Sequence, residues 1–373
     1  MEYKEYRERK ISRLGYGCMR FPLREGSETA IDEERAGKLL ERALSGGINY
    51  FDTAYPYHGR TSEEFVGRVL GRYPRESYLL ATKLPVFSVR SRQEAEEIFS
   101  GQLERLRTDH FDFYLMHAMN AERFEKVKEL GLYDMLREKK EEGIIRNLGF
   151  SFHDSPAVLE KIVDEWPFDF AQIQLNYLDW TLQNAERQYG VLSERGIPVM
   201  VMEPVRGGFL SRLPEEASRL LSSVHPEWSE AAWALRWVSS LPGVQVILSG
   251  MSAEDQLEDN LSTFSSLFPL GDEELEAIDA VREILLKANT IKCTGCRYCL
   301  PCTKGILIPS LFSSYNTMLN TGGKESFVAS YQGEKVKGSE CVDCLKCVKA
   351  CPQGLEINKL VKDVDKAAKA WGA

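Results

Sequence analysis

The chain has 373 residues, of which 43% are hydrophobic and 28% charged, as in soluble globular proteins. Its net charge of −9 argues against a nucleic-acid-binding surface, and no apolar run approaches the roughly 18 residues that a membrane-spanning helix needs. The charged start, MEYKEYRERK, lacks the apolar centre of a signal peptide. We therefore expect a cytoplasmic protein that binds neither nucleic acid nor membrane.

Eight short apolar runs alternate with helical stretches before residue 286. They are LGYGC from Leu14, INYFD from Ile48, SYLLATK from Ser77, FDFYLMH from Phe111, IIRNLGFS from Ile144, FAQIQLN from Phe170, IPVMVMEP from Ile197 and VQVILSG from Val244. Such runs are typical of parallel strands buried on both faces. Eight β/α units predict an α/β protein with a (β/α)8 TIM barrel. An open doubly wound sheet is the alternative, but the G-x-G-x-x-G that often follows its first strand is absent.

Two of the helical stretches carry start and stop signals. In IDEERAGKLLERALSGG, Asp32 is the expected N-cap and Gly46 the expected stop. In RTSEEFVGRVLG, Thr61 and Glu64 have the spacing of a capping box. Both helices are therefore expected to lie between barrel strands.

Four reactive side chains lie where strands end, which is where a barrel of this kind places its active site. Asp52 and Tyr57 follow the second strand in FDTAYPYHG. Lys83 ends the third strand in ATK, and His117 ends the fourth in YLMH. A nearby ammonium lowers the pKa of a tyrosine from its reference value of about 10, and a carboxylate can hold that ammonium in place. Tyr57 could then protonate a carbonyl oxygen, and His117 could hydrogen-bond to it.

The segments FDTAYPYHGRTSEEFVG, ATK, LMH, IRNLGFS and ILSGMSAEDQLEDNL resemble the aldo/keto reductase family in order and spacing, over roughly residues 10–265. The resemblance implies a (β/α)8 barrel that reduces aldehydes or ketones with a nicotinamide cofactor. It places the catalytic tetrad of the family on Asp52, Tyr57, Lys83 and His117. It also places the contacts to the nicotinamide amide on Ser151 and Gln172.

The sequence departs from the family around the cofactor. Phe152 replaces the usual Asn, Met202 replaces the Tyr that stacks on the nicotinamide, and Gly250 and Gln256 replace the basic pair at the 2′-phosphate. These departures leave NADP, NAD and a flavin open. Arg206 is either a cation that binds a pyrophosphate or a charge at the rim of the barrel. The segment 250–260 is expected to form the start of a helix beside the adenosine. The cofactor-binding residues expected in all are Ser151, Gln172, Val205, Arg206, Gly208, Ser249, Met251, Gln256 and Asn260.

Eight of the nine cysteines lie in the last quarter of the chain. The second run, CVDCLKCVKACP, has the C-x2-C-x2-C-x3-C-P spacing of bacterial ferredoxins, whereas the first, CTGCRYCLPC, is one residue shorter and lacks the final proline. Two zinc sites of four thiolates each are the alternative, although zinc modules usually supply their cysteines as C-x2-C pairs. In a reducing cytoplasm the spacing favours two [4Fe–4S] clusters over disulfides.

The ferredoxin pattern implies that the fourth cysteine of one run binds the cluster of the other. This assigns one cluster to Cys293, Cys296, Cys299 and Cys351, and the other to Cys341, Cys344, Cys347 and Cys302. A 38-residue spacer of helical character separates the runs, as in α-helical ferredoxin domains that are fused to dehydrogenases. We expect a barrel domain at 1–285 and a small, mostly helical ferredoxin-like domain at 286–373. The combination of the two domains resembles iron–sulfur-containing aldo/keto reductase-like oxidoreductases.

Three functions fit these patterns. The leading hypothesis is an oxidoreductase acting on a small carbonyl or alcohol, with clusters that exchange single electrons with a ferredoxin-like partner. A flavin could take part, because nicotinamide does not readily split a hydride into single electrons. The alternatives are a degenerate barrel that serves as an electron-transfer or docking scaffold, and clusters with a purely structural role. The intact set Asp52, Tyr57, Lys83 and His117 favours the enzyme.

Overall fold

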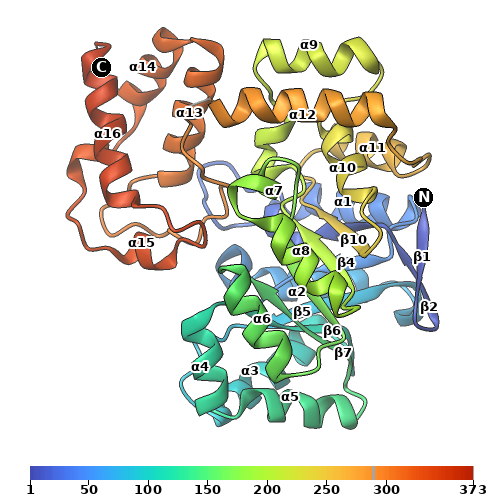
Figure 1. Cartoon of the computed structure of the whole chain (residues 1–373). Coiled ribbons are helices and arrows are strands. Elements are labelled where there is room, and N and C mark those ends of the chain that lie inside the picture. The colour runs from blue at the N-terminus through green and yellow to red at the C-terminus, as the bar shows by residue number, and fades with distance from the viewer. Residues whose placement is uncertain (288–289, 373) are drawn as a thin grey trace. The chain divides into compact units, whose positions relative to one another are not determined.

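The computed structural model describes residues 1–287 and 290–372, which form two compact units (Figure 1). The first contains Met1–Pro204 and Ala234–Leu270, and the second contains Val205–Trp233 and Gly271–Ala373. The segment Val205–Trp233 thus groups with the cysteine-bearing part of the chain, although in sequence it lies within the expected barrel domain. None of the described helices is long and apolar enough to cross a membrane.

The first unit is built on a closed barrel of eight parallel strands, which confirms the predicted (β/α)8 architecture and excludes the open sheet. Its closed order is β10-β3-β4-β5-β6-β7-β8-β9, so each strand pairs with its sequence neighbours. All eight predicted runs contain a strand. The strands are β3 (Leu14–Gly17), β4 (Tyr50–Asp52), β5 (Leu79–Leu84), β6 (Phe111–Met119), β7 (Ile145–Phe152), β8 (Phe170–Gln174), β9 (Val199–Met202) and β10 (Val244–Ser249).

Helices follow the strands and pack against one another around the barrel. Asp32 caps α1 as predicted, since its side chain accepts from the Arg35 N–H at 3.2 Å. The predicted capping box at Thr61 is wrong, because Thr61 has helical backbone angles and its hydroxyl donates to the His58 carbonyl at 2.8 Å. The helices are α1 (Glu33–Ser45), α2 (Ser62–Leu70), α3 (Arg92–Leu106), α4 (Ala121–Glu129), α5 (Leu132–Glu141), α6 (Pro156–Glu165), α7 (Asp179–Leu182), α8 (Ala185–Glu194) and α11 (Glu254–Thr263); α10 (Glu230–Ser239) spans the boundary between the units.

An antiparallel hairpin of β1 (Tyr3–Tyr6) and β2 (Arg9–Ser12) closes one end of the barrel. Tyr6 and Ile11 join the buried residues inside the barrel, and the Tyr6 hydroxyl donates to the Asp169 carbonyl at 2.9 Å. Asp169 directly precedes β8, so the hairpin covers the end where strands begin. The opposite end, where strands finish, is therefore the one left for chemistry.

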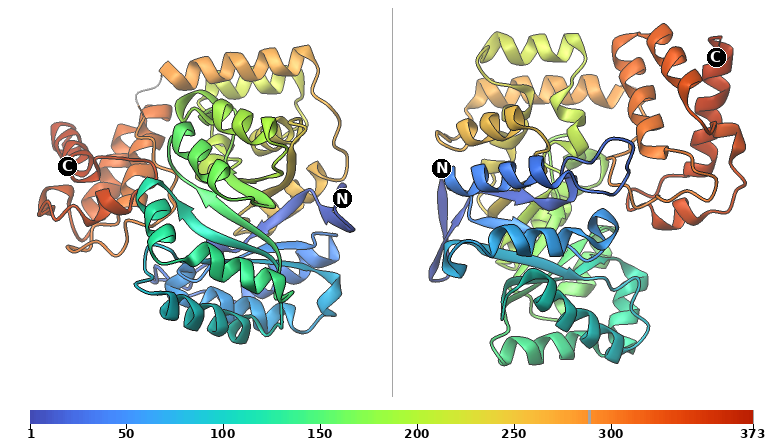
Figure 2. Two further views of the ribbon diagram at one scale, coloured as in Figure 1. Left: turned by 60° about the horizontal axis from the view of Figure 1, so that its bottom comes forward. Right: turned by 180° about the vertical axis from the view of Figure 1, so that it is seen from behind.

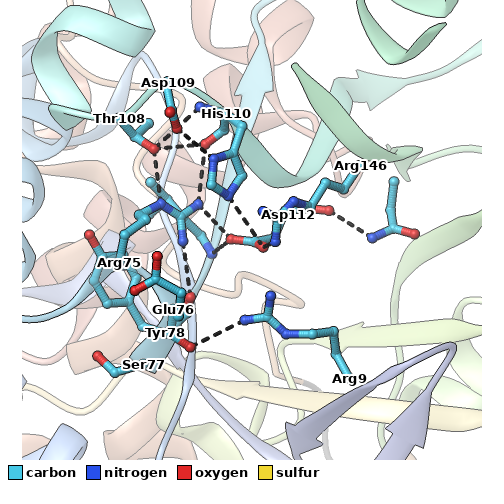
Figure 3. A network of polar contacts seen from close by, with 12 residues as sticks. Arg9, Arg75, Glu76, Ser77, Tyr78, Thr108, Asp109, His110, Asp112 and Arg146 are labelled. Carbon is cyan, nitrogen blue, oxygen red and sulfur yellow. Dashed lines mark hydrogen bonds and ion pairs between the residues drawn. The ribbon is translucent and has the colours of Figure 1, made fainter. Parts of the chain in front are cut away.

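The end where strands begin also carries a buried charge network (Figure 3). The Asp112 carboxylate is 2% exposed and accepts from Arg75 at 2.6 Å, from Arg146 at 3.0 Å and from the Leu80 N–H at 2.9 Å. These residues come from three neighbouring strands or the loops just before them. Asp112 thus ties β5, β6 and β7 together away from the strand ends that carry the predicted catalytic residues.

The second unit is helical, as its spacer and tail predicted. The helices α13, α14 and α16 pack on one another and enclose a small apolar core that includes Phe312, Phe327 and Val361 (Figure 2, red and orange). Most of the cysteines lie partly buried against this core. Its helices are α9 (Glu215–Val224), α12 (Asp272–Lys287), α13 (Ile308–Thr321), α14 (Lys324–Gly333), α15 (Lys346–Ala350) and α16 (Ile357–Ala370), with 3-10 turns η4 (Arg206–Ser211) and η5 (Gly338–Glu340).

Candidate functional site

A buried ion pair lies at the end of β4 and β5 in the barrel. The Lys83 ammonium is 2.6 Å from an Asp52 carboxylate oxygen and donates to the Thr53 carbonyl at 2.8 Å. The side chains of Lys83 and Asp52 are only 1% and 4% exposed. Burial raises the pKa of Asp52, and the Lys83 ammonium opposes that rise. The pair therefore fixes one ammonium in a dry site.

Two aromatic rings stand beside this ammonium. Lys83 Nζ is 5.2 Å from the centre of the Tyr57 ring, which comes from the 3-10 turn η2 (Tyr57–Arg60) after β4. The His117 ring lies 6.0 Å from the Tyr57 ring at an interplanar angle of 81°. The structure thus brings Asp52, Tyr57, Lys83 and His117 together at the end of the barrel where strands finish.

His117 differs from its expected place in one respect. It does not end its strand, because β6 continues to Met119 through an irregular register after Met116 and a left-handed Ala118 (φ 56°). Burial, and then the charge of Lys83, hold the pKa of His117 well below its ordinary value. The imidazole is consequently neutral at neutral pH and can donate one hydrogen bond without carrying charge.

Ser151 and Gln172 lie on the adjoining strands β7 and β8. The Ser151 hydroxyl oxygen accepts from the Ala118 N–H at 2.7 Å, which leaves its own O–H to donate. The Gln172 amide nitrogen lies 3.7 Å from the Met202 sulfur. Its amide oxygen is buried and makes no hydrogen bond within residues 1–287 and 290–372. A buried acceptor of this kind calls for a donor on a bound molecule.

The residues expected beside the adenosine lie on and before α11 in the first unit. Asn260 donates to the Ser249 hydroxyl at 2.8 Å, and the Tyr16 hydroxyl donates to the Met251 carbonyl at 2.6 Å. The Gln256 amide oxygen accepts from the Ser252 N–H at 2.9 Å. Ser249, Met251, Gln256 and Asn260 are thus held by internal hydrogen bonds.

Val205, Arg206 and Gly208 belong to the second unit instead. Arg206 is 3% exposed, and its guanidinium donates to the Lys292 carbonyl at 3.3 Å. Lys292 directly precedes the first cysteine of the first run. Arg206 therefore supports the start of this run, and its expected contact with a pyrophosphate stays a prediction.

Sequence reasoning missed two features at this end of the barrel. Phe87 packs on His117 with ring centres 5.6 Å apart, and Arg20 after β3 pairs with Glu203 after β9 at 2.9 Å. The only sequence signal for either is its position just beyond a predicted strand. Cys18, at the end of the first barrel strand, is fully buried, as is common for a small apolar residue.

The eight remaining cysteines lie in the second unit, and seven of them fall into two sets by their electrostatic effect on one another. Burial raises the pKa of the Cys299 thiol, and Cys296, Cys293 and Cys351 add to this rise. Burial also raises the pKa of the Cys347 thiol, to which Cys341 and Cys302 add. A cavity is lined by Cys302, Cys341, Cys344 and Cys347. Cys351 thus groups with cysteines of the first run and Cys302 with cysteines of the second, and the assignment of the eight cysteines to two clusters stays a prediction.

The loops that carry the cysteines have the tight backbone that cluster ligation needs. Arg297, Asp343 and Leu345 have positive φ values between 52° and 65°, and Gly295 has a φ of 66°. Within the described residues, no three or more cysteine, histidine or acidic side chains gather closely enough to hold a single metal ion. Four thiolates per set are the donors that a [4Fe–4S] cluster takes.

The second run is anchored by a buried hydrogen-bond network. The Tyr331 hydroxyl donates to Asp365 at 2.5 Å and accepts from the Gly338 N–H at 3.0 Å. A Cβ added at Gly338 would lie 2.0 Å from the Val361 carbonyl oxygen, so this position must be glycine. These contacts fix the chain three residues before Cys341.

Residues 13–283 match the aldo/keto reductase family. The chain belongs to this family. Residues 292–356 match a 4Fe-4S dicluster domain. This protein is therefore an oxidoreductase of the aldo/keto reductase type that also carries a 4Fe-4S domain, as the sequence predicted.

Relatives resemble the barrel part of this aldo/keto reductase. The uncharacterized oxidoreductase YqkF of Bacillus subtilis is 27% identical over 75% of this chain and 95% of its own. The NADH-specific methylglyoxal reductase of Escherichia coli is 23% identical over 68% of this chain and 90% of its own. Among solved structures, the holo form of aldo-keto reductase AKR11C1 from Bacillus halodurans is 27% identical, covers 75% of this chain and 96% of its own, and has a TM-score of 0.61.

Proposed function

We propose that this aldo/keto reductase transfers hydride between a nicotinamide nucleotide and a small carbonyl or alcohol at Asp52, Tyr57, Lys83 and His117. The observation that carries the proposal is the buried Lys83–Asp52 ion pair, with the ammonium 2.6 Å from the carboxylate and 5.2 Å from the Tyr57 ring. Burying a charge pair costs free energy of desolvation, and a buried pair with two titratable rings beside it is therefore typical of a functional site.

Each of the four side chains has a role that its surroundings support. Tyr57 donates the proton that a reduced carbonyl oxygen needs, and the Lys83 ammonium stabilises the phenolate that remains. Asp52 holds Lys83 in place through their ion pair. The neutral His117 imidazole donates a hydrogen bond to the substrate oxygen and orients the carbonyl carbon.

The nicotinamide fits the hydrogen-bonding groups on β7 and β8. A primary carboxamide has two N–H donors and one carbonyl acceptor. The buried Gln172 oxygen can accept from such an amide, and the Ser151 hydroxyl can donate to it. When bound, the nucleotide supplies the hydride. Because Gly250 and Gln256 offer no cation to a 2′-phosphate, and one relative is named an NADH-specific reductase, NADH is the first nucleotide to test and NADPH the second.

The cysteine unit is proposed to hold two [4Fe–4S] clusters in a cluster-binding domain at 286–373, beside a catalytic domain at 1–285. Cluster I takes Cys293, Cys296, Cys299 and Cys351, and cluster II takes Cys302, Cys341, Cys344 and Cys347. The two sets of mutually influencing thiols support this exchange. A reducing compartment such as the cytoplasm would keep these thiols available.

Coupling between the two domains must reconcile their electron counts. A hydride carries two electrons together, whereas a cluster passes one at a time, so a coupled reaction uses two cluster oxidations for each carbonyl. A flavin exchanges both one and two electrons and is the cofactor suited to link the steps. Flavin binding is therefore part of the proposal.

Nucleotide binding and carbonyl turnover by anaerobically purified protein test the proposal. We expect saturable binding of NADH or NADPH and its oxidation with small aldehydes, methylglyoxal first. Titration with flavin mononucleotide is the parallel arm. If no nicotinamide nucleotide binds and no aldehyde is reduced, the barrel is a scaffold and the proposal is wrong.

A further inference from the structure

The two proposed clusters differ in how far they are covered. Cys344 of cluster II is exposed, whereas the other seven cluster cysteines are only partly exposed. The first run is held inward by Arg206 and by Asn316, which exchanges hydrogen bonds with the Ile291 backbone at 2.8 and 2.7 Å. In the second run, Asp343 accepts from Asn358 at 3.0 Å and from Lys362 on α16, but the neighbouring Cys344 stays exposed. Cluster II is therefore the more accessible of the two.

Two large apolar side chains on that loop face solvent. Val342 is 53% exposed and Leu345 is 42% exposed, on either side of Cys344. Leu345 also adopts a left-handed conformation (φ 57°), in which glycine or asparagine would be less strained by about 1 kcal/mol. Val342 and Leu345 thus form a small exposed apolar patch beside Cys344, which suits contact with another molecule.

The segment that carries the loop is basic although the whole chain is acidic, and the exposed Asp343 of the loop pairs with Lys362. Residues 286–373 hold 13 Lys and Arg against 7 Asp and Glu, whereas the rest of the chain holds 34 against 49. Lys346 lies within the loop, and Lys304 lines the same cavity as Cys302 and Cys344. Both lysines are exposed. An apolar centre with a charged rim is the anatomy of a protein interface, and this rim attracts an acidic partner.

We propose that Val342, Leu345, Lys304 and Lys346 form the docking surface for a small acidic electron-carrier protein, and that electrons enter through cluster II. The proposal rests on the clusters assigned above. In each encounter the carrier is oxidised by one electron and cluster II is reduced by one, with no bond formed or broken. The small apolar area matches the transient complexes of redox carriers, which bury less than about 1,200 Å².

Rapid-mixing experiments on the full-length anaerobic holoprotein test this surface. The donor is a reduced [2Fe–2S] ferredoxin of net negative charge, whose EPR signal differs from that of a [4Fe–4S] cluster. The variants are Lys304→Glu, Lys346→Glu and the double variant Val342→Ser with Leu345→Ser. Lys366→Glu on α16 and Leu319→Ser on α13 are matched controls for exposed charge and exposed apolar area. Dithionite serves as the small reductant that needs no docking.

We expect the charge-reversal variants to slow reduction by the ferredoxin roughly tenfold or more at low salt and to flatten its salt dependence. The serine variant should slow it at all salt concentrations, while both controls and all dithionite rates stay within about twofold of wild type. Lys304 lies on a loop distant in sequence from the Val342–Leu345 loop. The proposal is overturned if the ferredoxin reduces Lys304→Glu and wild type at equal rates. A loss of self-association in the serine variant would also overturn it, since the face would then join two copies of this chain.

Carbonyl reduction with NADH or NADPH is measured on the same samples. If the barrel proves inactive while the ferredoxin rates respond to the variants, the docking surface stands without the proposed hydride chemistry. If turnover is normal and the ferredoxin rates do not respond, the docking surface alone is wrong.

Discussion

The barrel and the cysteine unit position their reactive groups in opposite ways. Lys83 and Asp52 lie on hydrogen-bonded strands of a closed sheet, and each is less than 5% exposed. The first cysteine run, by contrast, has neither helix nor strand between Cys293 and Cys302, and its thiols are partly exposed. The fold alone builds the barrel site. The cysteine loops, by contrast, are expected to need a bound iron–sulfur cluster to complete them.

The amount of apolar core explains this difference. The barrel is filled by large side chains such as Tyr50, Phe113 and Phe170 and is sealed by the hairpin. The helices of the second unit enclose a much smaller core, against which the cysteines pack. Small domains commonly rely on a bound metal for part of their stability.

Removal of iron should therefore separate the two regions most strongly. Anaerobic treatment with a strong iron chelator should abolish the visible absorption and open residues 290–356 to proteolysis, while a barrel fragment survives. Limited proteolysis with mass spectrometry measures this. Equal protease resistance of the iron-free and iron-loaded forms would show that the cysteine loops are preformed as the barrel is.

Substitution of Tyr57 should act on the barrel alone. Tyr57→Phe removes the proposed proton donor and should lower kcat for carbonyl reduction by roughly 10²- to 10⁴-fold, with the iron content unchanged. Tyr55→Phe is the control, because that ring contacts Arg60 and Arg105 instead. A Tyr57→Phe enzyme with nearly normal kcat would remove Tyr57 from the reaction.

Asp112 offers a test of stability at the other end of the barrel. Asp112→Asn leaves Arg75 and Arg146 without their shared carboxylate and should lower the free energy of unfolding of the barrel by about 3 kcal/mol. Asp109→Asn changes a carboxylate that is 92% exposed and should cost less than about 0.5 kcal/mol. Urea unfolding followed by circular dichroism measures both. A loss of iron in Asp112→Asn would mean that the units are not independent.

Acid should weaken the barrel through His153. Burial, and then Arg123, lower the pKa of His153 to about 4, so the folded barrel binds fewer protons than the unfolded chain below pH 6.5. His153 therefore leaves the free energy of unfolding of the barrel unchanged above that pH. As the pH is lowered to 5, this free energy falls by up to about 2 kcal/mol. His153→Gln should flatten this dependence in thermal unfolding.

In the second unit, His225 has a pKa that is shifted in the opposite direction from that of His153. Burial opposes its charge, but hydrogen bonds to Glu274 and Glu227 outweigh this and raise the pKa of His225. Its stabilising effect is present below the unfolded pKa and is lost as the pH rises through the folded pKa. Identical pH profiles for the two units would contradict the assignment of these histidines.

Much of this contrast was visible in the sequence. The eight strands, the grouping of Asp52, Tyr57, Lys83 and His117 and the paired cysteine runs depend on local spacing and strand order, which a sequence displays directly. The hairpin was missed because charged residues surround its two inward side chains, Tyr6 and Ile11. The Arg20–Glu203 pair and the place of Val205–Trp233 in the second unit depend on contacts between distant segments, which no local pattern encodes.

We propose that hydride chemistry in the barrel and electron transfer by the clusters belong to one reaction. The most direct measurement follows cluster absorbance and EPR after protein with reduced clusters is mixed anaerobically with the aldehyde, flavin mononucleotide, and a catalytic amount of the oxidised form of the nucleotide that binds. We expect the clusters to be reoxidised with two electrons lost for each alcohol formed. Tyr57→Phe should stop both alcohol formation and cluster reoxidation. Cluster reoxidation at a rate independent of the aldehyde, the nucleotide and Tyr57 would contradict the proposed coupling.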